Sequence, residues 1–234
     1  MIWAVVPVKD LAGAKNRLSD VLSPDERHAL AVAMLHDVLD ALANTPALDG
    51  IAVITRDPEA EALAQAVGAQ IWREERNSGE SAAVEFAARQ CVQRSIPAML
   101  VIPGDAPLVR PEDVQSVLAA DSGQPGLVLV SSRDGTGSNA VLRRPPDAIG
   151  SHFGATSFRE HQEEAAACGI PVRTVRNFRL ELDVDTPDDL GLFVAYENVP
   201  SLRPRRTTRA YAALERLGLA KRLAELPFSL RAKQ

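Results

Sequence analysis

Three aspartates stand where their side chains could bind a divalent metal ion. Asp105 follows Gly104 at the end of the apolar run 98–103, which is typical of a buried strand, and Pro107 stiffens the chain after it. A carboxylate at the end of a strand is well placed to bind Mg2+. Asp183 and Asp185 lie two positions apart. In an extended segment their side chains point to the same side, with Cα atoms roughly 6.5–7 Å apart.

The spacing of these carboxylates indicates phosphoryl-transfer chemistry. Two carboxylates this close repel each other unless a cation lies between them or water screens them. A metal pair in phosphoryl transfer needs bridging carboxylates of this kind, with ions about 3.5–4 Å apart. The sequence offers the three aspartates no obvious basic partner, which favours a metal site. The alternative for Asp105 is a turn residue that caps the next helix, but Pro111 begins that helix several residues later.

Asp188 and Asp189 have a simpler explanation than metal binding. They follow Thr186 and Pro187, a pattern that is typical of a helix start with Thr186 as the N-cap and Pro187 as the first helical residue. Acidic residues in a first helical turn interact favourably with the helix dipole. We therefore expect these two carboxylates to stabilise a helix.

A basic segment with a glycine follows the first predicted strand. Gly13 and the alanines beside it let the backbone approach a ligand, and Lys9, Lys15 and Arg17 supply three cations for a polyphosphate. The alternative is a solvated basic loop. Neither the GxxxxGK[ST] phosphate loop nor the GxGxxG dinucleotide fingerprint occurs in the chain, so the fold families that depend on them lose their main support.

Two further polar segments could hold an anion. Residues 133–140 contain two glycines, Thr136 and Ser138, and link two predicted strands; the alternative is a hairpin turn. Gly154 lies just before a predicted helix, and the free amides of a helix N-terminus bind anions. Ser157 and Glu160 predict a capping box at that helix.

The elements that must position these residues alternate between strands and helices, which is typical of an α/β fold with a mostly parallel sheet covered by helices. Apolar runs predict strands at Ile2–Val8, Ile51–Thr55, Gln70–Arg73, Ala98–Pro103, Leu127–Ser131, Asn139–Leu142 and Pro171–Val175. Capping patterns and helical spacing predict a helix that starts at Pro24 after Ser23, and others at Pro58–Val67, Ser81–Gln93, Pro111–Ala119, Ser157–Cys168 and Pro187–Tyr196.

The chain changes character after residue 198. Residues 199–206 form a basic link punctuated by prolines. Tyr211, Leu214 and Leu217 then make a short apolar stripe at helical spacing, and a second piece follows at Leu219, Leu223 and Leu226. We therefore divide the chain into a domain at 1–198 and a basic, partly helical appendage at 199–234. We expect the appendage to pack on the domain or on a second copy in a homodimer.

Composition excludes several classes of function. Residues 201–234 hold nine basic and two acidic residues, which leaves 17 basic and 29 acidic residues in 1–200. An acidic body argues against nucleic-acid binding, which needs a basic face. No run approaches the roughly 18 apolar residues of a membrane span, and no basic region precedes the first strand as in a signal peptide. Cys91 and Cys168 are far apart, which indicates reduced thiols in a cytoplasmic protein.

Five segments together resemble the 2-phospho-L-lactate guanylyltransferase family of coenzyme F-420 biosynthesis. They are PVKDLAGAKNRL, PGDAPL, DGTGSNAVL, FGATSF and LDVDTPDDL, in this order over residues 1–195. The resemblance implies a nucleotidyltransferase-type fold like that of the nucleotide-diphospho-sugar transferases. It also implies transfer of GMP from GTP to a three-carbon phosphorylated acid, with release of pyrophosphate. The family's acceptors are 2-phospho-L-lactate, phosphoenolpyruvate and 3-phospho-D-glycerate.

The resemblance also implies roles for single residues. Asp105, Asp183 and Asp185 would bind Mg2+, or Mn2+ in its place. The segments around Thr136 and Ser138, and around Gly154 and Ser157, would hold the acceptor. In the in-line attack on the α-phosphorus of GTP that such an enzyme performs, we expect Lys15 and Arg17 to stabilise the leaving pyrophosphate.

One segment departs from the family pattern. Residues 76–81 read Arg-Asn-Ser-Gly-Glu-Ser where a Leu-Asn-Ala type of run would seat the base. Gly79 still allows close backbone approach, and Glu80 could accept hydrogen bonds from the N1–H and the N2 amine of guanine. Ser78, His152 and Arg144 are further polar residues near the expected site. They favour 3-phospho-D-glycerate, whose extra hydroxyl needs a polar partner; the alternative is that all three face solvent.

Two alternatives stay open. One is a related nucleotidyltransferase that acts on a sugar phosphate or on molybdenum cofactor, although its glycine-rich LAGGxSxRMG loop is missing. The other is a non-catalytic nucleotide-binding scaffold whose basic tail binds an acidic partner, although a scaffold gains nothing from clustered carboxylates.

Overall fold

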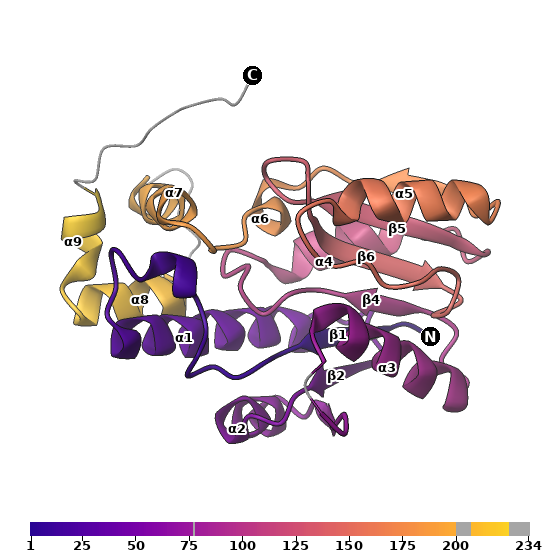
Figure 1. Cartoon of the computed structure of the whole chain (residues 1–234), viewed down its shortest axis with the longest axis horizontal. Coiled ribbons are helices and arrows are strands. Elements are labelled where there is room, and N and C mark those ends of the chain that lie inside the picture. Colours follow the sequence, from indigo (N-terminus) through magenta and orange to yellow (C-terminus); the bar gives the residue numbers. More distant parts are fainter. Residues whose placement is uncertain (77, 200–206, 225–234) are drawn as a thin grey trace.

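A seven-stranded sheet with the strand order β3-β2-β1-β4-β6-β5-β7 forms the centre of the molecule (Figure 1). The computed structural model describes residues 1–76, 78–199 and 207–224. All of the predicted strands are present in it, with bounds that shift by a few residues at most. They are β1 (Trp3–Pro7), β2 (Gly50–Ile54), β3 (Gln70–Trp72), β4 (Met99–Val101), β5 (Gly126–Ser131), β6 (Ser138–Arg144) and β7 (Val172–Thr174).

The sheet is mostly parallel, as predicted, and one strand reverses. β1 pairs in parallel with β2 and β4, β2 with β3, and β5 with β7. β6 runs antiparallel to both of its neighbours, β4 and β5. The first residue of β6 therefore lies near the carboxyl ends of β1 and β4, and its last residue lies at the opposite end of the sheet, near the amino ends of those strands.

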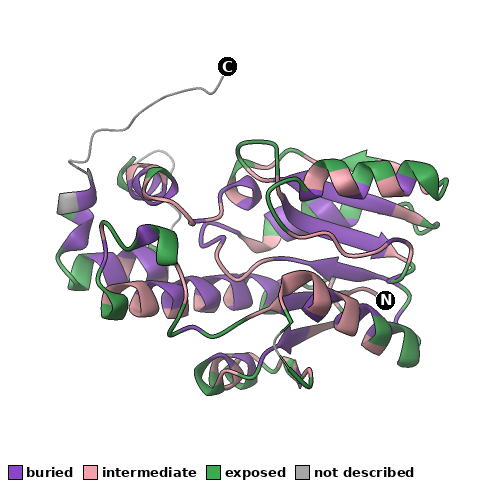
Figure 2. Ribbon diagram, viewed as in Figure 1, coloured by how far each residue is buried: buried purple, intermediate pink, exposed green. Residues whose placement is uncertain are grey.

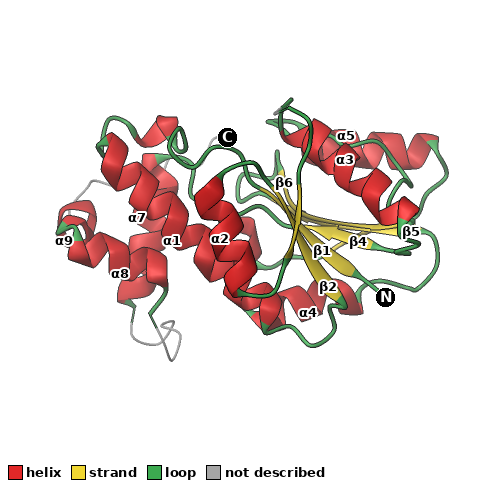
Figure 3. Cartoon of the chain, turned by 90° about the horizontal axis from the view of Figure 1, so that it is seen from below, coloured by secondary structure: helices red, strands yellow, loops and turns green. Residues whose placement is uncertain are grey.

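Helices cover both faces of the sheet, as the view along its edge shows (Figure 3). One core contains Val6, Val53 and Leu100 together with residues of α1, α2 and α4, and a second contains Val5, Ala52 and Val101 with residues of α3. Successive residues of β1 thus face opposite layers, and both are buried, which explains why central strands read as unbroken apolar runs. Figure 2 shows the strands buried and the outer faces of the helices exposed.

The predicted helices are present, and short helical turns join them. The predicted ones are α1 (Pro24–Ala43), α2 (Pro58–Ala66), α3 (Glu80–Gln93), α4 (Pro111–Ala119), α5 (Ser157–Ala167) and α7 (Pro187–Asn198). Capping boxes start α1 at Ser23 and α7 at Thr186. The turn η1 (Asn16–Leu18) and α6 (Phe178–Glu181) were not predicted, because elements this short leave no apolar period. Among the described helices, none is long and apolar enough to cross a membrane.

The predicted capping box at Ser157 is wrong. Thr156 is the N-cap of α5 and makes no side-chain capping bond. The hydroxyl of Ser157 instead accepts a hydrogen bond of 2.9 Å from the backbone amide of Ser138 at the start of β6. A buried strand amide needs an acceptor, and this tertiary demand is not visible in the local sequence.

The C-terminal segment adds two helices, α8 (Arg209–Arg216) and α9 (Leu219–Ala224), and α8 packs against α1 (Figure 1). The carboxylate of Asp37 on α1 accepts hydrogen bonds of 2.8 Å from the backbone amides of Arg209 and Ala210. These amides belong to the first turn of α8, where a negative charge is favourable. Residues 200–206 of the predicted basic link, and Leu226, lie outside the described residues.

The predicted apolar stripe on this segment is only partly buried. Tyr211 and Leu214 are buried against residues of α1 and α7, including Phe193. Leu217 keeps 41% of its surface exposed, because α8 ends at Arg216 and the chain turns at Gly218, whose φ is 68°. The division of the chain at residue 198 stays a prediction.

Substitution of Leu214 by alanine tests the docking of α8. Leu214 is fully buried, so Leu214→Ala should lower the free energy of unfolding by about 2–4 kcal/mol. Leu217→Ala removes the same atoms from the exposed position and should cost at most about 0.5 kcal/mol. Urea denaturation measures both values. Equal, small losses would contradict packing of α8 on the domain.

Candidate active site

The three predicted aspartates converge at the carboxyl ends of the central strands. One side-chain oxygen from each of Asp105, Asp183 and Asp185 lies within 4.8 Å of the others. Asp105 follows β4, while Asp183 and Asp185 lie in the segment between α6 and α7. The two segments are tied together by a hydrogen bond of 3.0 Å from the amide of Val184 to the carbonyl of Asp105.

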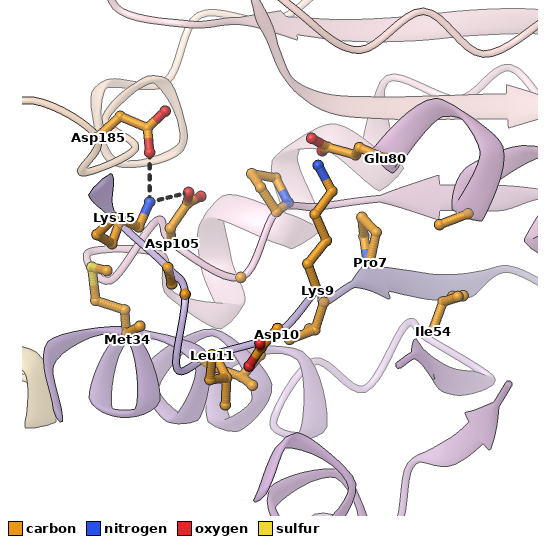
Figure 4. Close-up of a pocket in the computed structure, with 18 of the residues that line it drawn as sticks. Pro7, Lys9, Asp10, Leu11, Lys15, Met34, Ile54, Glu80, Asp105 and Asp185 are labelled. Carbon is orange, nitrogen blue, oxygen red and sulfur yellow. Dashed lines mark hydrogen bonds and ion pairs between the residues drawn. The ribbon is translucent and has the colours of Figure 1, made fainter. Parts of the chain in front are cut away.

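Lys15 bridges two of these carboxylates, so the expectation that they have no basic partner is wrong. Its ammonium lies 2.5 Å from Oδ2 of Asp105 and 2.6 Å from Oδ1 of Asp185 (Figure 4). Lys15 itself sits in the left-handed region, with φ of 58° and ψ of 38°, just before η1. The partners are 90 and 170 positions away along the chain, which is why the sequence did not reveal them.

The charges at this site shift the pKa values of its groups. Burial opposes the charged form of Lys15, but Asp105 and Asp185 outweigh it and raise the pKa of the ammonium. Burial and the neighbouring Asp105 and Asp185 raise the pKa of Asp183, and a hydrogen bond from Asn139 opposes this change. Within the described residues, Oδ1 of Asp105 is buried without a hydrogen-bond partner. A buried, unpaired carboxylate oxygen is costly unless a cation satisfies it.

A cavity of about 340 Å³ opens beside the acidic cluster. Several of the predicted nucleotide-binding residues line it, namely Lys9, Gly13, Lys15, Glu80 and Asp105. Arg17 lies at the edge of the site, with its guanidinium 3.7 Å from Oδ2 of Asp185 and its side chain 74% exposed. Gly79 is the N-cap of α3 and has a φ of 102°, a backbone conformation that residues other than glycine rarely adopt.

Glu80 and Lys9 lie at the other end of this cavity from the acidic cluster, with the Lys9 side chain extending toward Glu80 (Figure 4). Burial, with a smaller contribution from Asp105, raises the pKa of Glu80 to about 7, and Lys9 opposes the change. Glu80 therefore exchanges its proton near neutral pH. The neighbouring Asn77 lies outside the described residues.

The predicted acceptor-binding residues lie close to one another but not in this cavity. Ser138 and Ser157 are joined by the backbone–side-chain hydrogen bond described above, and the hydroxyl of Ser138 lies 3.0 Å from Nδ1 of the buried His161. Thr136 donates its hydroxyl to Asp134 at 2.7 Å. Gly154 is exposed, with φ of 152°. The serine side chains thus connect β6 to α5 through hydrogen bonds. A role of these four residues in binding the acceptor stays a prediction.

Two residues that favoured 3-phospho-D-glycerate have other partners. Arg144 is the last residue of β6 and lies at the amino end of β4, whereas Asp105 lies beyond the carboxyl end of β4. Arg144 forms an ion pair with Asp121 at 2.6 Å. The imidazole of His152 pairs with Glu164. Neither residue supports a preference among acceptors. The expected placement of Arg144 near the site is wrong, because the sequence did not show that β6 runs antiparallel.

The structure adds Asn139 to the site, a residue that the sequence placed only at the start of a strand. Its side-chain amide donates a hydrogen bond of 2.9 Å to Oδ1 of Asp183, and the residue is 5% exposed. A buried polar residue needs partners, so an asparagine in an apolar strand was an available signal, although it did not identify the partner.

Comparison with known proteins identifies the family of the chain. The family model "Guanylyl transferase CofC like" matches residues 2–202. The chain is 37% identical to the phosphoenolpyruvate guanylyltransferase of Rubrobacter xylanophilus, over 88% of this chain and 98% of that protein. It is 36% identical to the 2-phospho-L-lactate guanylyltransferase of Methanothermobacter thermautotrophicus, over 82% and 84%. It is also 37% identical to the 3-phospho-D-glycerate guanylyltransferase of Phenylobacterium zucineum, over 81% and 88%.

Solved structures confirm the predicted fold. A proposed nucleotide-diphospho-sugar transferase of Desulfovibrio desulfuricans superposes with a TM-score of 0.75 at 20% identity, and the match covers 95% of this chain and 97% of that one. The CTP complex of CMP:2-keto-3-deoxy-manno-octonic acid synthetase gives a TM-score of 0.57 at 16% identity, over 92% and 99%. The family match favours the guanylyltransferase prediction over the sugar-phosphate, molybdenum-cofactor and scaffold alternatives. This chain belongs to the family of CofC-like guanylyl transferases.

Proposed function

We propose that the chain transfers GMP from GTP to a three-carbon phosphorylated acid, with release of pyrophosphate, as a step of coenzyme F-420 biosynthesis. The convergence of Asp105, Asp183 and Asp185 beside a cavity lined by Lys9 and Lys15 carries this proposal. Relatives named for three different acceptors are almost equally similar to the chain, at 36–37% identity. Overall similarity therefore does not single out one acceptor, but it supports an acceptor of this chemical class.

The acidic cluster fits a hard divalent cation such as Mg2+ or Mn2+. Three carboxylate oxygens lie within reach of one ion, and one oxygen of Asp105 is buried without a partner among the described residues. Carboxylate oxygens are the ligands that these ions prefer. Bound there, the ion would neutralise charge between the α-phosphate of GTP and the acceptor phosphate. The cluster supplies the negative charge that holds it.

The side chains around the cavity would then align two anions and bind the leaving group. Lys9 and Lys15 line the cavity in which the polyphosphate of GTP would lie, and the exposed Arg17 lies beside Asp185. In the structure the ammonium of Lys15 neutralises the carboxylates, so a divalent cation at the same carboxylates would free it for the pyrophosphate. Charge neutralisation and alignment lower the barrier of such an in-line transfer. No general base is needed, because a phosphate monoester is already ionised at neutral pH.

Glu80 is the residue that we propose to read the base. It lines the cavity away from the acidic cluster, and its carboxylate offers two acceptors to the N1–H and the N2 amine of guanine. The same carboxylate would face the acceptor N1 of adenine, which it repels. The nearby Gly79 leaves open space where a side chain would stand, so the base can approach the backbone.

Removal of the metal or of one aspartate tests the metal site. Pyrophosphate release from GTP and the three acids should require Mg2+ or Mn2+ and cease in excess EDTA. Asp183→Asn and Asp105→Ala should lower turnover by about 100-fold or more, with the fold retained by circular dichroism. Asp188→Asn, at the exposed acid of the first turn of α7, is the matched control and should keep activity. Full activity in excess EDTA would refute the metal assignment.

Substitution of Lys15 tests whether its ammonium and a metal ion share the cluster. Without metal, Lys15→Met should lower the free energy of unfolding by about 1–3 kcal/mol, less than the 3–5 kcal/mol of a fully buried pair, because Asp185 is 41% exposed and water screens it. Mg2+ should recover part of this loss. Lys9→Met, at an exposed position, should change stability little. Urea denaturation with EDTA or Mg2+ measures these effects, and an equal response of wild type and Lys15→Met to Mg2+ would contradict the sharing.

Nucleotide selectivity tests the role of Glu80. GTP should be used in preference to ATP, and Glu80→Gln should reduce the ratio of their kcat/KM values by about 10–100-fold. Because the pKa of Glu80 is raised to about 7, the accepting carboxylate is lost as pH falls below 7, so the preference should grow from pH 6 to pH 8. Glu74→Gln, a second carboxyl in the cavity, is the control. Equal rates with GTP and ATP in the wild type would show that Glu80 does not read the base.

A further inference from the structure

Asn139 holds the segment that carries Asp183. Its side-chain nitrogen lies 2.9 Å from Oδ1 of Asp183 and 3.1 Å from the carbonyl oxygens of both Leu180 and Glu181. An amide NH2 has two hydrogens, so three acceptors share them. The residue stands at the start of β6 and is buried, and it therefore connects the sheet directly to the end of α6 and to the carboxylate beyond it.

The acidic cluster is held by two different kinds of group. Lys15 grips Asp105 and Asp185 through its positive charge. Asp183 instead accepts a hydrogen bond from the neutral side-chain amide of Asn139. A neutral donor orients a carboxylate without cancelling its charge, so Asp183 keeps its full attraction for a cation. A hydrogen-bonded partner behind a metal-binding carboxylate is a common way to fix its orientation.

We propose that Asn139 is a positioning residue, which holds the Asp183 carboxylate within reach of Asp105 and Asp185 so that the three bind one divalent cation together. The proposal rests on the metal site proposed above. Without the Asn139 amide, no hydrogen bond from this residue opposes the repulsion of Asp183 by the two neighbouring carboxylates. The chain that leads to Asp183 also loses the two hydrogen bonds to the carbonyl groups of residues 180 and 181. Removal of the Asn139 amide is therefore expected to lower the affinity of the site for the metal ion, in addition to any decrease in the free energy of unfolding.

Asn177 offers a matched control at the other end of α6. Its side-chain oxygen accepts hydrogen bonds of 3.1 and 3.2 Å from the amides of Arg179 and Leu180, at the start of α6. Its nitrogen donates to Asp113 at 2.8 Å. Asn139 and Asn177 thus hold the two ends of α6, but of the two only Asn139 is hydrogen-bonded to a member of the acidic cluster. A purely structural role predicts the same outcome for both.

The test is Mn2+ binding to the free protein, measured by electron paramagnetic resonance without GTP or acceptor. Asn139→Ala should weaken Mn2+ binding by about 10–100-fold, the range typical of lost outer partners of metal ligands. Asn177→Ala should weaken it by less than about 3-fold, a loss typical of sites without a shared partner. Urea denaturation of both variants reports the loss of stability. Asn139→Ser, which keeps one donor, should fall between Asn139→Ala and the wild type, and it provides the comparison if Asn139→Ala does not fold.

The outcomes separate this inference from the proposal on which it rests. Wild-type affinity in Asn139→Ala or Asn139→Ser would overturn the positioning role, and so would an equal loss of affinity in Asn177→Ala. In both cases the wild type still binds Mn2+ and the metal site stands. A wild type that binds no Mn2+ would instead overturn the metal site, and the positioning role with it.

Discussion

Mutual repulsion among Asp105, Asp183 and Asp185 is the constraint to which the rest of the site is adapted. One oxygen of each lies within 4.8 Å of the others, at the carboxyl ends of buried central strands, where the dielectric response is weaker than in water. The chain counters this repulsion with the ammonium of Lys15, the amide of Asn139 and the backbone bond between Val184 and Asp105. A site that is held together against its own charge is suited to bind a divalent cation and then a triphosphate.

The fold brings these groups together through strand order and shared packing. β1 and β4 are neighbours, so the loop after β1 delivers Lys15 beside Asp105. The residues that flank Asp183, Leu182 and Val184, are fully buried in the same apolar cluster as Tyr211 of α8. Helix α8 therefore supports the segment that carries the aspartates, although it supplies no side chain to the cavity.

Features that depend on local spacing could be predicted, and features that depend on distant partners could not. The strands and the paired projection of Asp183 and Asp185 follow from the period of 2 along extended chain, and the caps at Ser23 and Thr186 follow from residue types at a fixed spacing of three. The bridge from Lys15 joins residues 90 and 170 positions apart. Because β6 runs antiparallel to its neighbours, Asn139 lies at the site and Arg144 lies at the opposite end of the sheet. A strand's direction leaves no local trace in its sequence.

The most direct test is the stoichiometry of the reaction with GTP, Mg2+ and an equal mixture of 2-phospho-L-lactate, phosphoenolpyruvate and 3-phospho-D-glycerate, followed by phosphorus NMR. Guanylyl transfer at this site predicts one pyrophosphate for each acid that becomes linked to GMP, and no pyrophosphate when the acids are left out. Hydrolysis of GTP without a GMP-linked acid, or pyrophosphate release that does not depend on any of the acids, would contradict it.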